Sequence, residues 1–411
     1  MIKDIEGVRQ SHWDPRTYVL HIGPLAGKAA SLLEIFEACS AAPCEYQQPP
    51  PGWMYFGTHV DDMPEVHTRC HDGKILDYFA GGINVEYALK FVGWQHVLGG
   101  TATVTDYDGY TVVTAECIAL IESTVKTHVI DKGRVLIQPR HIMAHDGVDS
   151  LKFAVALEPG DPGRAEQLLM QSETRTLIGI GHWVGLWHPQ ALFPFNAASE
   201  FAHNPDYGVL SFCLHAFMFL KAHPDPPNYG GPGCTSLELA SPTIPPFTPG
   251  QREWGLHASC DASILIKSIT GGNVMLAGCR IAPMCGRQHI VAPESFAAEL
   301  TAAGTVLNQL LPCRGQMLEV SIYQDQPTPL YIDSSSCVFV IHDARAVGKK
   351  SIWIRRRAAI LQEAQRMKEI IAVKIDGKDN PSDAETKALA FKMWRRLVWY
   401  SNNLPGPMPE R

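Results

Sequence analysis

The chain has 411 residues and a formal net charge of −7, with 45% hydrophobic and 19% charged residues. This composition is typical of a folded protein of two or three domains, and it excludes disordered, collagen-like and coiled-coil proteins. No apolar run reaches the roughly 18–20 residues that a membrane-spanning helix needs. The first residues carry charges where a signal peptide would have its apolar core. We therefore expect an intracellular protein, cytoplasmic or nuclear, that is neither secreted nor inserted in a membrane.

Charge is distributed unevenly along the chain. Residues 342–411 contain 15 Lys and Arg against 8 Asp and Glu, a formal charge of +7, whereas residues 1–341 carry −14. The net acidity alone would argue against nucleic acid as a partner, but the basic C-terminal region removes that objection. The eleven cysteines are scattered, and no two have the CxxC spacing. We therefore expect free thiols in a reducing compartment, without a disulfide framework or a zinc ribbon.

The N-terminal half has the pattern of a mixed α and β structure. Strands are predicted at residues 54–59, 97–104 and 110–114. The last two form a hairpin that turns at Tyr107–Gly109. Residues 191–222 predict a helix broken at Asn204–Pro205, and residues 72–90 look partly helical. Residues 224–250 are dense in proline and glycine, which predicts a linker.

From about Arg252 the strands and helices are easier to separate. Strands are predicted at residues 255–260, 272–279, 330–332 and 370–375. Helices are predicted at residues 293–311, 351–369 and 384–400. Pro293 suits the first position of its helix, and residues 377–380 predict a turn. This order of elements predicts an α/β (α+β) domain of about 150 residues.

Four acidic residues lie at the boundaries of these C-terminal elements. Asp261 ends the first strand and Asp333 ends the third. Glu299 lies within the first helix, and Asp383 can cap the last one. A lone aspartate at a strand end is usually a turn or cap residue. Together, carboxylates from strand ends and a helix make a hard-oxygen site suited to Mg²⁺ or Mn²⁺, and two such ions can act on a phosphodiester.

The four carboxylates occur in short motifs that follow one another along the chain. These motifs are DAS at 261–263 with KSITG at 267–271, SFAAEL at 295–300, YIDSSS at 331–336 and NPSDAETK at 380–387. In order and spacing they resemble the RNase H domain of copia-type retrotransposon Pol polyproteins. That family has Asp-x-Asp, Lys-Ser-x-Thr-Gly, Ser-x-x-Glu-Ala-Glu-Tyr, Tyr-x-Asp-Asn/Ser and Asn-x-Ala-Asp-x-x-Thr-Lys. Ser263, Ala297 and Leu300 depart from the family pattern.

The resemblance implies an RNase H-like mixed five-stranded sheet with flanking helices. It also implies two Mg²⁺ or Mn²⁺ ions that take part in hydrolysing the RNA strand of an RNA–DNA hybrid. The metal-binding and catalytic residues would be Asp261, Glu299, Asp333 and Asp383, all of which are present.

A basic segment follows the third carboxylate. It contains Lys349, Lys350, Arg355, Arg356 and Arg357. Basic residues beside a metal site can hold the phosphates of a duplex, and the family often carries them here. The alternative for the three arginines is an ordinary solvated helix face. We expect this segment to bind nucleic acid.

The N-terminal half resembles the reverse transcriptase of the same family. The segment HVDD at 59–62 is similar to its Tyr-x-Asp-Asp turn, which would make Asp61 and Asp62 polymerase carboxylates. The segments LLEIFEACSAAPCEY at 32–46 and FVGWQHVLG at 91–99 are similar to the sequences on either side of that turn. The segment RTLIGIGHWVGLWHPQ at 175–190 is similar to the family's connection region.

We expect the polymerase part to be defective. Asp14 is the one candidate for its third carboxylate, it precedes Asp61 by 47 residues, and the family's fingers region is missing upstream. The predicted organisation is therefore a truncated palm at 1–150, a connection region and linker at 151–250, an RNase H-like domain at 251–400 and a tail at 401–411.

Two alternatives remain open. The chain could be a catalytically inactive, nucleic-acid-binding relic of such an element, and carboxylates scattered beyond metal-bridging range would favour this alternative. It could also be an unrelated metal hydrolase that uses His141 and His145, which lack a third ligand with suitable spacing. The oligomeric state is not predicted.

Overall fold

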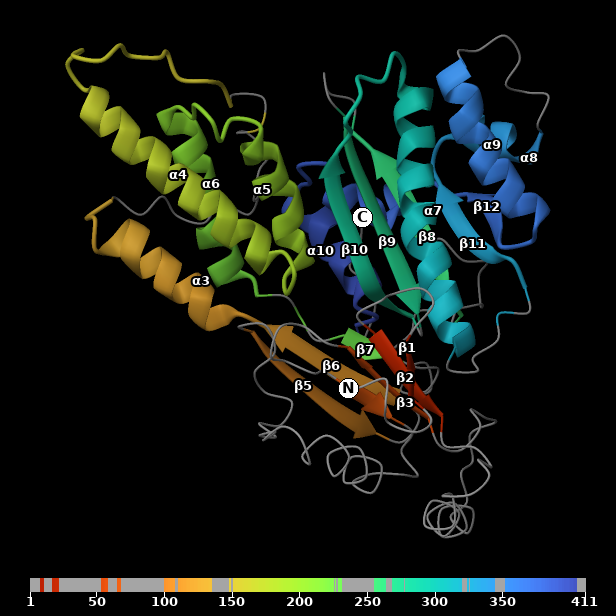
Figure 1. Ribbon diagram of the computed structural model, residues 1–411. Coiled ribbons are helices and arrows are strands. Elements are labelled where there is room, and N and C mark those ends of the chain that lie inside the picture. Colours follow the sequence, from red (N-terminus) through yellow and green to blue (C-terminus); the bar gives the residue numbers. More distant parts are fainter. Residues whose placement is uncertain are drawn as a thin grey trace. The chain divides into compact units, whose positions relative to one another are not determined.

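A computed structural model describes much of the chain (Figure 1). The described residues are 8–10, 17–21, 53–57, 65–67, 100–107, 110–134, 148, 151–224, 226, 228–230, 255–263, 268–276, 278–319, 324, 326–343 and 352–404. Two compact units are present, one of residues 1–99 with 311–325 and one of residues 100–310 with 326–411. The domain limits that the sequence suggests stay predictions.

The first unit contains a four-stranded antiparallel sheet. Its strands are β1 (Val8–Gln10), β2 (Thr17–His21), β3 (Trp53–Gly57) and β4 (Glu65–His67), in that spatial order. The strand predicted at 54–59 corresponds to β3. The segment predicted to be partly helical, 72–90, lies outside the described residues.

The second unit begins with the predicted hairpin. Strands β5 (Thr101–Tyr107) and β6 (Tyr110–Glu116) are antiparallel, and Tyr107 lies opposite Tyr110, which confirms the hairpin. The short strand β7 (Asn228–Gly230) pairs with β6.

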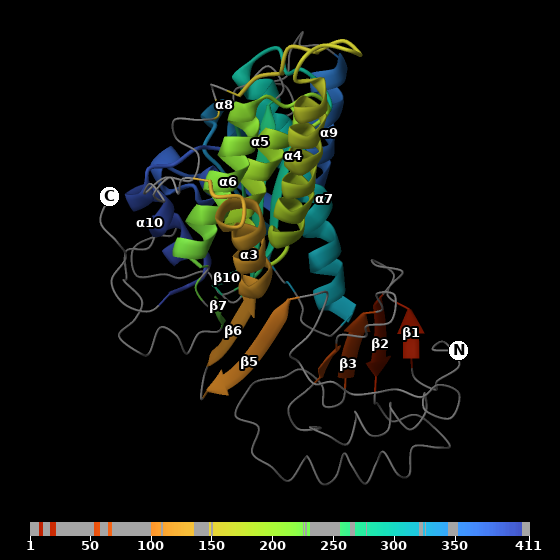
Figure 2. The same cartoon turned by 90° about the vertical axis from the view of Figure 1, so that its left-hand side faces the viewer.

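Four α-helices follow the hairpin, and Figure 2 shows α4, α5 and α6 side by side. They are α3 (Ile118–Val125), α4 (Arg164–Val184), α5 (Leu192–Ser199) and α6 (Tyr207–Ala222). The predicted break at Asn204–Pro205 is confirmed. Helix α6 starts after it, because the Asp206 side chain accepts a hydrogen bond from the Val209 N–H at 3.0 Å.

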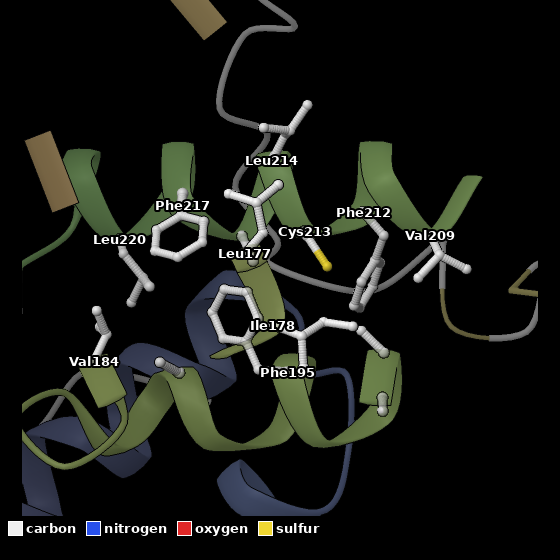
Figure 3. Close-up of a cluster of buried hydrophobic side chains, with 14 of the residues drawn as sticks. Leu177, Ile178, Val184, Phe195, Val209, Phe212, Cys213, Leu214, Phe217 and Leu220 are labelled. Atoms are coloured by element: carbon white, nitrogen blue, oxygen red, sulfur yellow. The ribbon is translucent and has the colours of Figure 1, made fainter. Parts of the chain in front are cut away.

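The helices α4, α5 and α6 share an apolar core (Figure 3). Leu177 on α4, Phe195 on α5 and Phe217 on α6 are each fully buried. The Phe195 and Phe217 rings lie 4.9 Å apart between centroids. A Cβ on Gly181 would come within 2.2 Å of the Phe195 ring, so α4 and α5 can only pack this closely at a glycine.

A five-stranded mixed sheet with flanking helices forms the rest of the second unit, as predicted. Its strands are β8 (His257–Ala262), β9 (Ile269–Leu276), β10 (Cys279–Arg287), β11 (Thr328–Ile332) and β12 (Ile370–Lys374). The spatial order is β10-β9-β8-β11-β12. The first three are antiparallel neighbours, whereas β8, β11 and β12 run parallel. The helices are α7 (Ser295–Glu319), α8 (Ser335–His342), α9 (Ile352–Arg366) and α10 (Phe391–Ser401). The residues of α7 from Leu311 onward are assigned to the first unit.

Several predicted limits are wrong. Strand β10 and helix α8 were not predicted at all. Helix α7 continues eight residues beyond the predicted end and contains Pro312. The last helix begins at Phe391 instead of residue 384, because residues 381–385 form a 3₁₀ helix, η9 (Pro381–Glu385). Asp383 therefore does not cap the last helix, whose N-cap is Ala390.

None of the helices in the described parts of the chain is both long enough and apolar enough to cross a membrane.

Candidate metal centre

Three of the predicted carboxylates meet at one edge of the mixed sheet. Asp261 lies in β8, and Asp333 directly follows the parallel neighbour β11. Because Cys260 and Ile332 are register partners, the next residue of each strand, an aspartate in both cases, emerges at the same edge. Glu299 on α7 completes the group, and one oxygen from each of the three residues lies within 4.8 Å of the others.

The site is buried and crowded with negative charge. Asp261 is 1% exposed and Glu299 is 6% exposed. Burial, followed by the charges of Asp261 and Asp333, raises the pKa of Glu299 from 4.5 to about 9. Burial and the charge of Asp261 also raise the pKa of Asp333. Without a cation, Glu299 therefore holds a proton that a free carboxylate would release at neutral pH.

The Oε2 atom of Glu299 is consistent with a metal ion at this site. This atom is buried and finds no hydrogen-bond partner among the described residues. A buried carboxylate oxygen that accepts no hydrogen bond lowers the stability of the fold. Three converging carboxylates are suitable ligands for a divalent cation. No other group of three or more metal-ligating side chains is found in the described parts of the chain.

Asp383, the fourth predicted ligand, is held differently. It lies in η9, and its Oδ1 accepts a hydrogen bond from Lys387 Nζ at 2.7 Å. Burial, together with the charge of Asp261, raises the pKa of Asp383 to about 7. Its oxygens are not among those that lie within 4.8 Å of one another. The structure thus brings together Asp261, Glu299 and Asp333, with Asp383 beside them in an ion pair.

The sequence did not assign roles to Thr386 and Lys387. The hydroxyl of Thr386 donates a hydrogen bond to Asp261 Oδ2, and Lys387 Nζ lies 3.3 Å from Asp261 Oδ1. They are the last two residues of the NPSDAETK segment, so the motif that carries the family resemblance already included them. Their contacts to a residue more than a hundred positions away could not be inferred from spacing.

Two consecutive glycines allow this arrangement. A Cβ on Gly271 would lie 2.4 Å from Thr386 Cγ2, and a Cβ on Gly272 would lie 2.3 Å from Val306 Cγ2 on α7. Neighbouring strand residues face opposite sides of a sheet. Gly271 therefore lets the η9 segment approach one face of β9, while Gly272 lets α7 approach the other.

Hydrogen bonds fix the η9 segment against β8. The Asn380 side chain donates to the carbonyl of Cys260 at 2.9 Å, one residue before Asp261. The hydroxyls of Ser259 and Ser382 lie 2.7 Å apart. These contacts position Asp383, Thr386 and Lys387 beside the carboxylate group.

The predicted basic segment lies partly on α9. Arg355 and Arg356 are exposed, whereas Arg357 is half-buried with its guanidinium 5.3 Å from the centroid of the Trp353 ring. Arg357 Nη1 lies 4.0 Å from the position that a Cβ on Gly304 would occupy. Gly304 lies on α7, five residues after Glu299. Lys349 and Lys350 lie outside the described residues.

The predicted polymerase carboxylates Asp14, Asp61 and Asp62 also lie outside the described residues, as do His141 and His145. Strands β3 and β4 are antiparallel neighbours, and Asp61 and Asp62 lie between them in the sequence. Thr17, three residues after Asp14, is the register partner of Gly57, four residues before Asp61. The strand ends nearest to these aspartates are therefore neighbours.

Comparisons with known proteins add no family to this description. No protein-family model, curated protein or solved structure matches the chain.

Proposed function

We propose that residues 251–400 form an RNase H-type nuclease domain that hydrolyses the RNA strand of RNA–DNA hybrids, in a fragment of a copia-type Pol polyprotein. The observation that carries this proposal is the convergence of Asp261, Glu299 and Asp333 within 4.8 Å of one another. The order of the four motifs along the chain and the mixed five-stranded sheet both support it.

Mg²⁺ or Mn²⁺ held by these carboxylates would supply electrostatic stabilisation of the attacking and leaving oxygens of a phosphodiester. The protein's own groups hold the carboxylates in position. Thr386 orients Asp261 through its hydroxyl, and Gly377 leaves room for Asp333, because a Cβ there would lie 3.3 Å from Asp333 Oδ2. Such fixed geometry is what a preorganised centre requires.

Helix α9 is the proposed contact for the duplex backbone. Arg355 and Arg356 are exposed and able to reach phosphates, and the proposal includes Lys349 and Lys350 just before the helix. Arg357 packs beside α7, the helix that carries Glu299. Positive charge along this helix favours phosphate binding regardless of base sequence.

The sheet of the first unit is proposed to be what remains of a polymerase palm, without polymerase activity. The antiparallel pair β3–β4 around Asp61 and Asp62 supports this origin. The pairing of Thr17 with Gly57 supports Asp14 as the third carboxylate.

The proposal is tested with the full chain and four substrates of one sequence. These are an RNA–DNA hybrid, double-stranded RNA, double-stranded DNA and single-stranded RNA, each in Mg²⁺ and in EDTA. We expect cleavage of the RNA strand of the hybrid in Mg²⁺ alone. Cleavage that persists in EDTA, or double-stranded RNA cut as fast as the hybrid, would contradict the proposal.

A further inference from the structure

The ammonium group of Lys387 lies between two carboxylates of the candidate metal centre. Its Nζ is 2.7 Å from Asp383 Oδ1 and 3.3 Å from Asp261 Oδ1. Asp383 and Lys387 are four residues apart, and the lysine side chain is 39% exposed while Asp261 is 1% exposed. The lysine therefore reaches from the surface of the domain to a buried aspartate.

The ammonium group lies where it would compete with a second cation. A cation that bridges Asp261 and Asp383 would lie close to Lys387 Nζ, which contacts the Oδ1 atom of both residues. The ammonium and a divalent ion placed there would repel each other strongly at such short range. Among the described residues, Lys387 forms ion pairs with Asp261 and Asp383, whereas neither Glu299 nor Asp333 forms one with a lysine.

We propose that Lys387 is a built-in cation that takes the second metal position, so that the centre binds one divalent ion, at Asp261, Glu299 and Asp333, in the absence of nucleic acid. The inference rests on the proposed function, because it needs the carboxylate group to be a metal centre. It replaces the two ions expected from the family resemblance with one ion and one ammonium group. Lys387 is thus a positioning residue that sets the metal count.

A second lysine provides the matched control. Lys374 Nζ donates hydrogen bonds to the main-chain carbonyls of Asp333, at 2.6 Å, and Ile375, at 2.5 Å. It carries the same charge beside the same centre, but its hydrogen bonds go to carbonyl oxygens and not to the carboxylates. Lys374→Gln therefore reports the effect of losing one positive charge nearby, without opening the place between Asp261 and Asp383.

The test is the number of Mn²⁺ ions bound per chain, measured by isothermal titration calorimetry on the full chain without nucleic acid. Ions bound elsewhere are counted with the triple variant D261N/E299Q/D333N and subtracted. We expect the centre to hold one ion in the wild type, in Lys374→Gln and in Lys387→Arg, which keeps the cation. We expect it to hold two ions in Lys387→Gln, with the folded state of each variant checked by circular dichroism.

Each outcome is decisive. A wild-type centre that holds two ions overturns the inference, and this result does not depend on whether Lys387→Gln folds. Equal counts in the wild type and in Lys387→Gln also overturn it. If the triple variant binds as many ions as the wild type, the carboxylate group is not a metal centre, and the proposed function fails together with the inference.

Discussion

Glu299 shows how strongly the fold can change the chemistry of one side chain. A glutamate within an amphipathic helix would ordinarily be solvated, yet this one is 6% exposed beside two aspartates. Its pKa is raised to about 9, so the folded chain holds this proton more tightly than the unfolded chain does. The resulting stabilisation is complete below the unfolded value of 4.5 and is lost as the pH rises through 9.

We therefore predict that the metal-free protein loses stability between pH 7 and pH 9, and that Glu299→Gln removes about 1–2 kcal/mol of this loss. An amide does not ionise, so the variant keeps the buried group neutral at both pH values. The measurement is urea unfolding in EDTA at the two pH values. Glu122→Gln, at an exposed position on α3, is the control. An unchanged pH dependence in Glu299→Gln would refute the buried, proton-holding carboxyl.

His188 produces the opposite dependence on pH. It is fully buried, its Nε2 accepts a hydrogen bond from the Cys117 N–H at 3.3 Å, and burial lowers its pKa from 6.5 to about 4. The folded chain binds this proton less tightly than the unfolded chain, so stability present above pH 6.5 is lost as the pH falls through 4.

We predict that lowering the pH from 7 to 4.5 destabilises the protein, with His188 contributing up to about 2–3 kcal/mol of that loss. His188→Gln should therefore lose less stability than the wild type over this interval, although it starts from a lower value. Thermal unfolding at both pH values checks this. Equal losses in the two proteins would show that His188 does not remain neutral in the fold.

At the scale of elements, strand β9 determines how closely the site can assemble. Gly271→Ala would place a Cβ 2.4 Å from Thr386 Cγ2 and 2.9 Å from the Ser382 carbonyl oxygen. We predict a loss of about 1–3 kcal/mol in the free energy of unfolding, as for other overpacked positions. Gly286→Ala on the neighbouring strand β10 is the control, because a Cβ there meets no described atom within 4 Å. Urea unfolding compares the two, and equal stabilities would contradict the packing of η9 on β9.

Helix α9 should control affinity for the duplex through phosphate contacts. We predict that R355Q/R356Q weakens hybrid binding and lowers the slope of log affinity against log salt by about 2. Fluorescence anisotropy at several salt concentrations measures both quantities. Arg366→Gln on the same helix is the control, since this exposed guanidinium is paired with Glu363, the closest contact being 2.5 Å. A slope that is equal in the wild type and the double variant would exclude these arginines from the interface.

Across the whole molecule, local patterns in the sequence predicted an α/β domain with carboxylates at the ends of its strands, whereas the five-stranded mixed sheet was expected from the family resemblance. Four carboxylates were expected to converge, and three of them do. Asp261 lies near the end of β8 and Asp333 directly follows β11, and parallel strands place such residues at one edge. Strand β10 was not predicted because it contains Pro283, and proline is unusual within a strand. The proline is tolerated because β10 is an edge strand. Helix α8 was not predicted because its run of apolar residues resembles that of a strand. Its start is marked by Ser334, whose side chain caps the helix by accepting a hydrogen bond from the Cys337 N–H.

The ion pairs of Lys387 could not be predicted from the sequence for a different reason. They join the end of the chain to β8, 126 positions away, and depend on how η9 packs against Gly271. The distribution of charge along the chain also bears on this site. The +7 of residues 342–411 includes Lys387 and the arginines of α9, so the basic region and the acidic centre belong to one domain of the fold.

The most direct test of metal-dependent nuclease activity is the initial rate at which the full chain cleaves an RNA–DNA hybrid in Mg²⁺, compared between the wild type and Asp333→Asn. The substitution is nearly isosteric and removes one of the three converging carboxylates. We predict that the rate falls about 100-fold or more, the scale expected when a preorganised electrostatic group is lost. Equal rates for the two proteins, or no cleavage by the wild type, would contradict the proposed function.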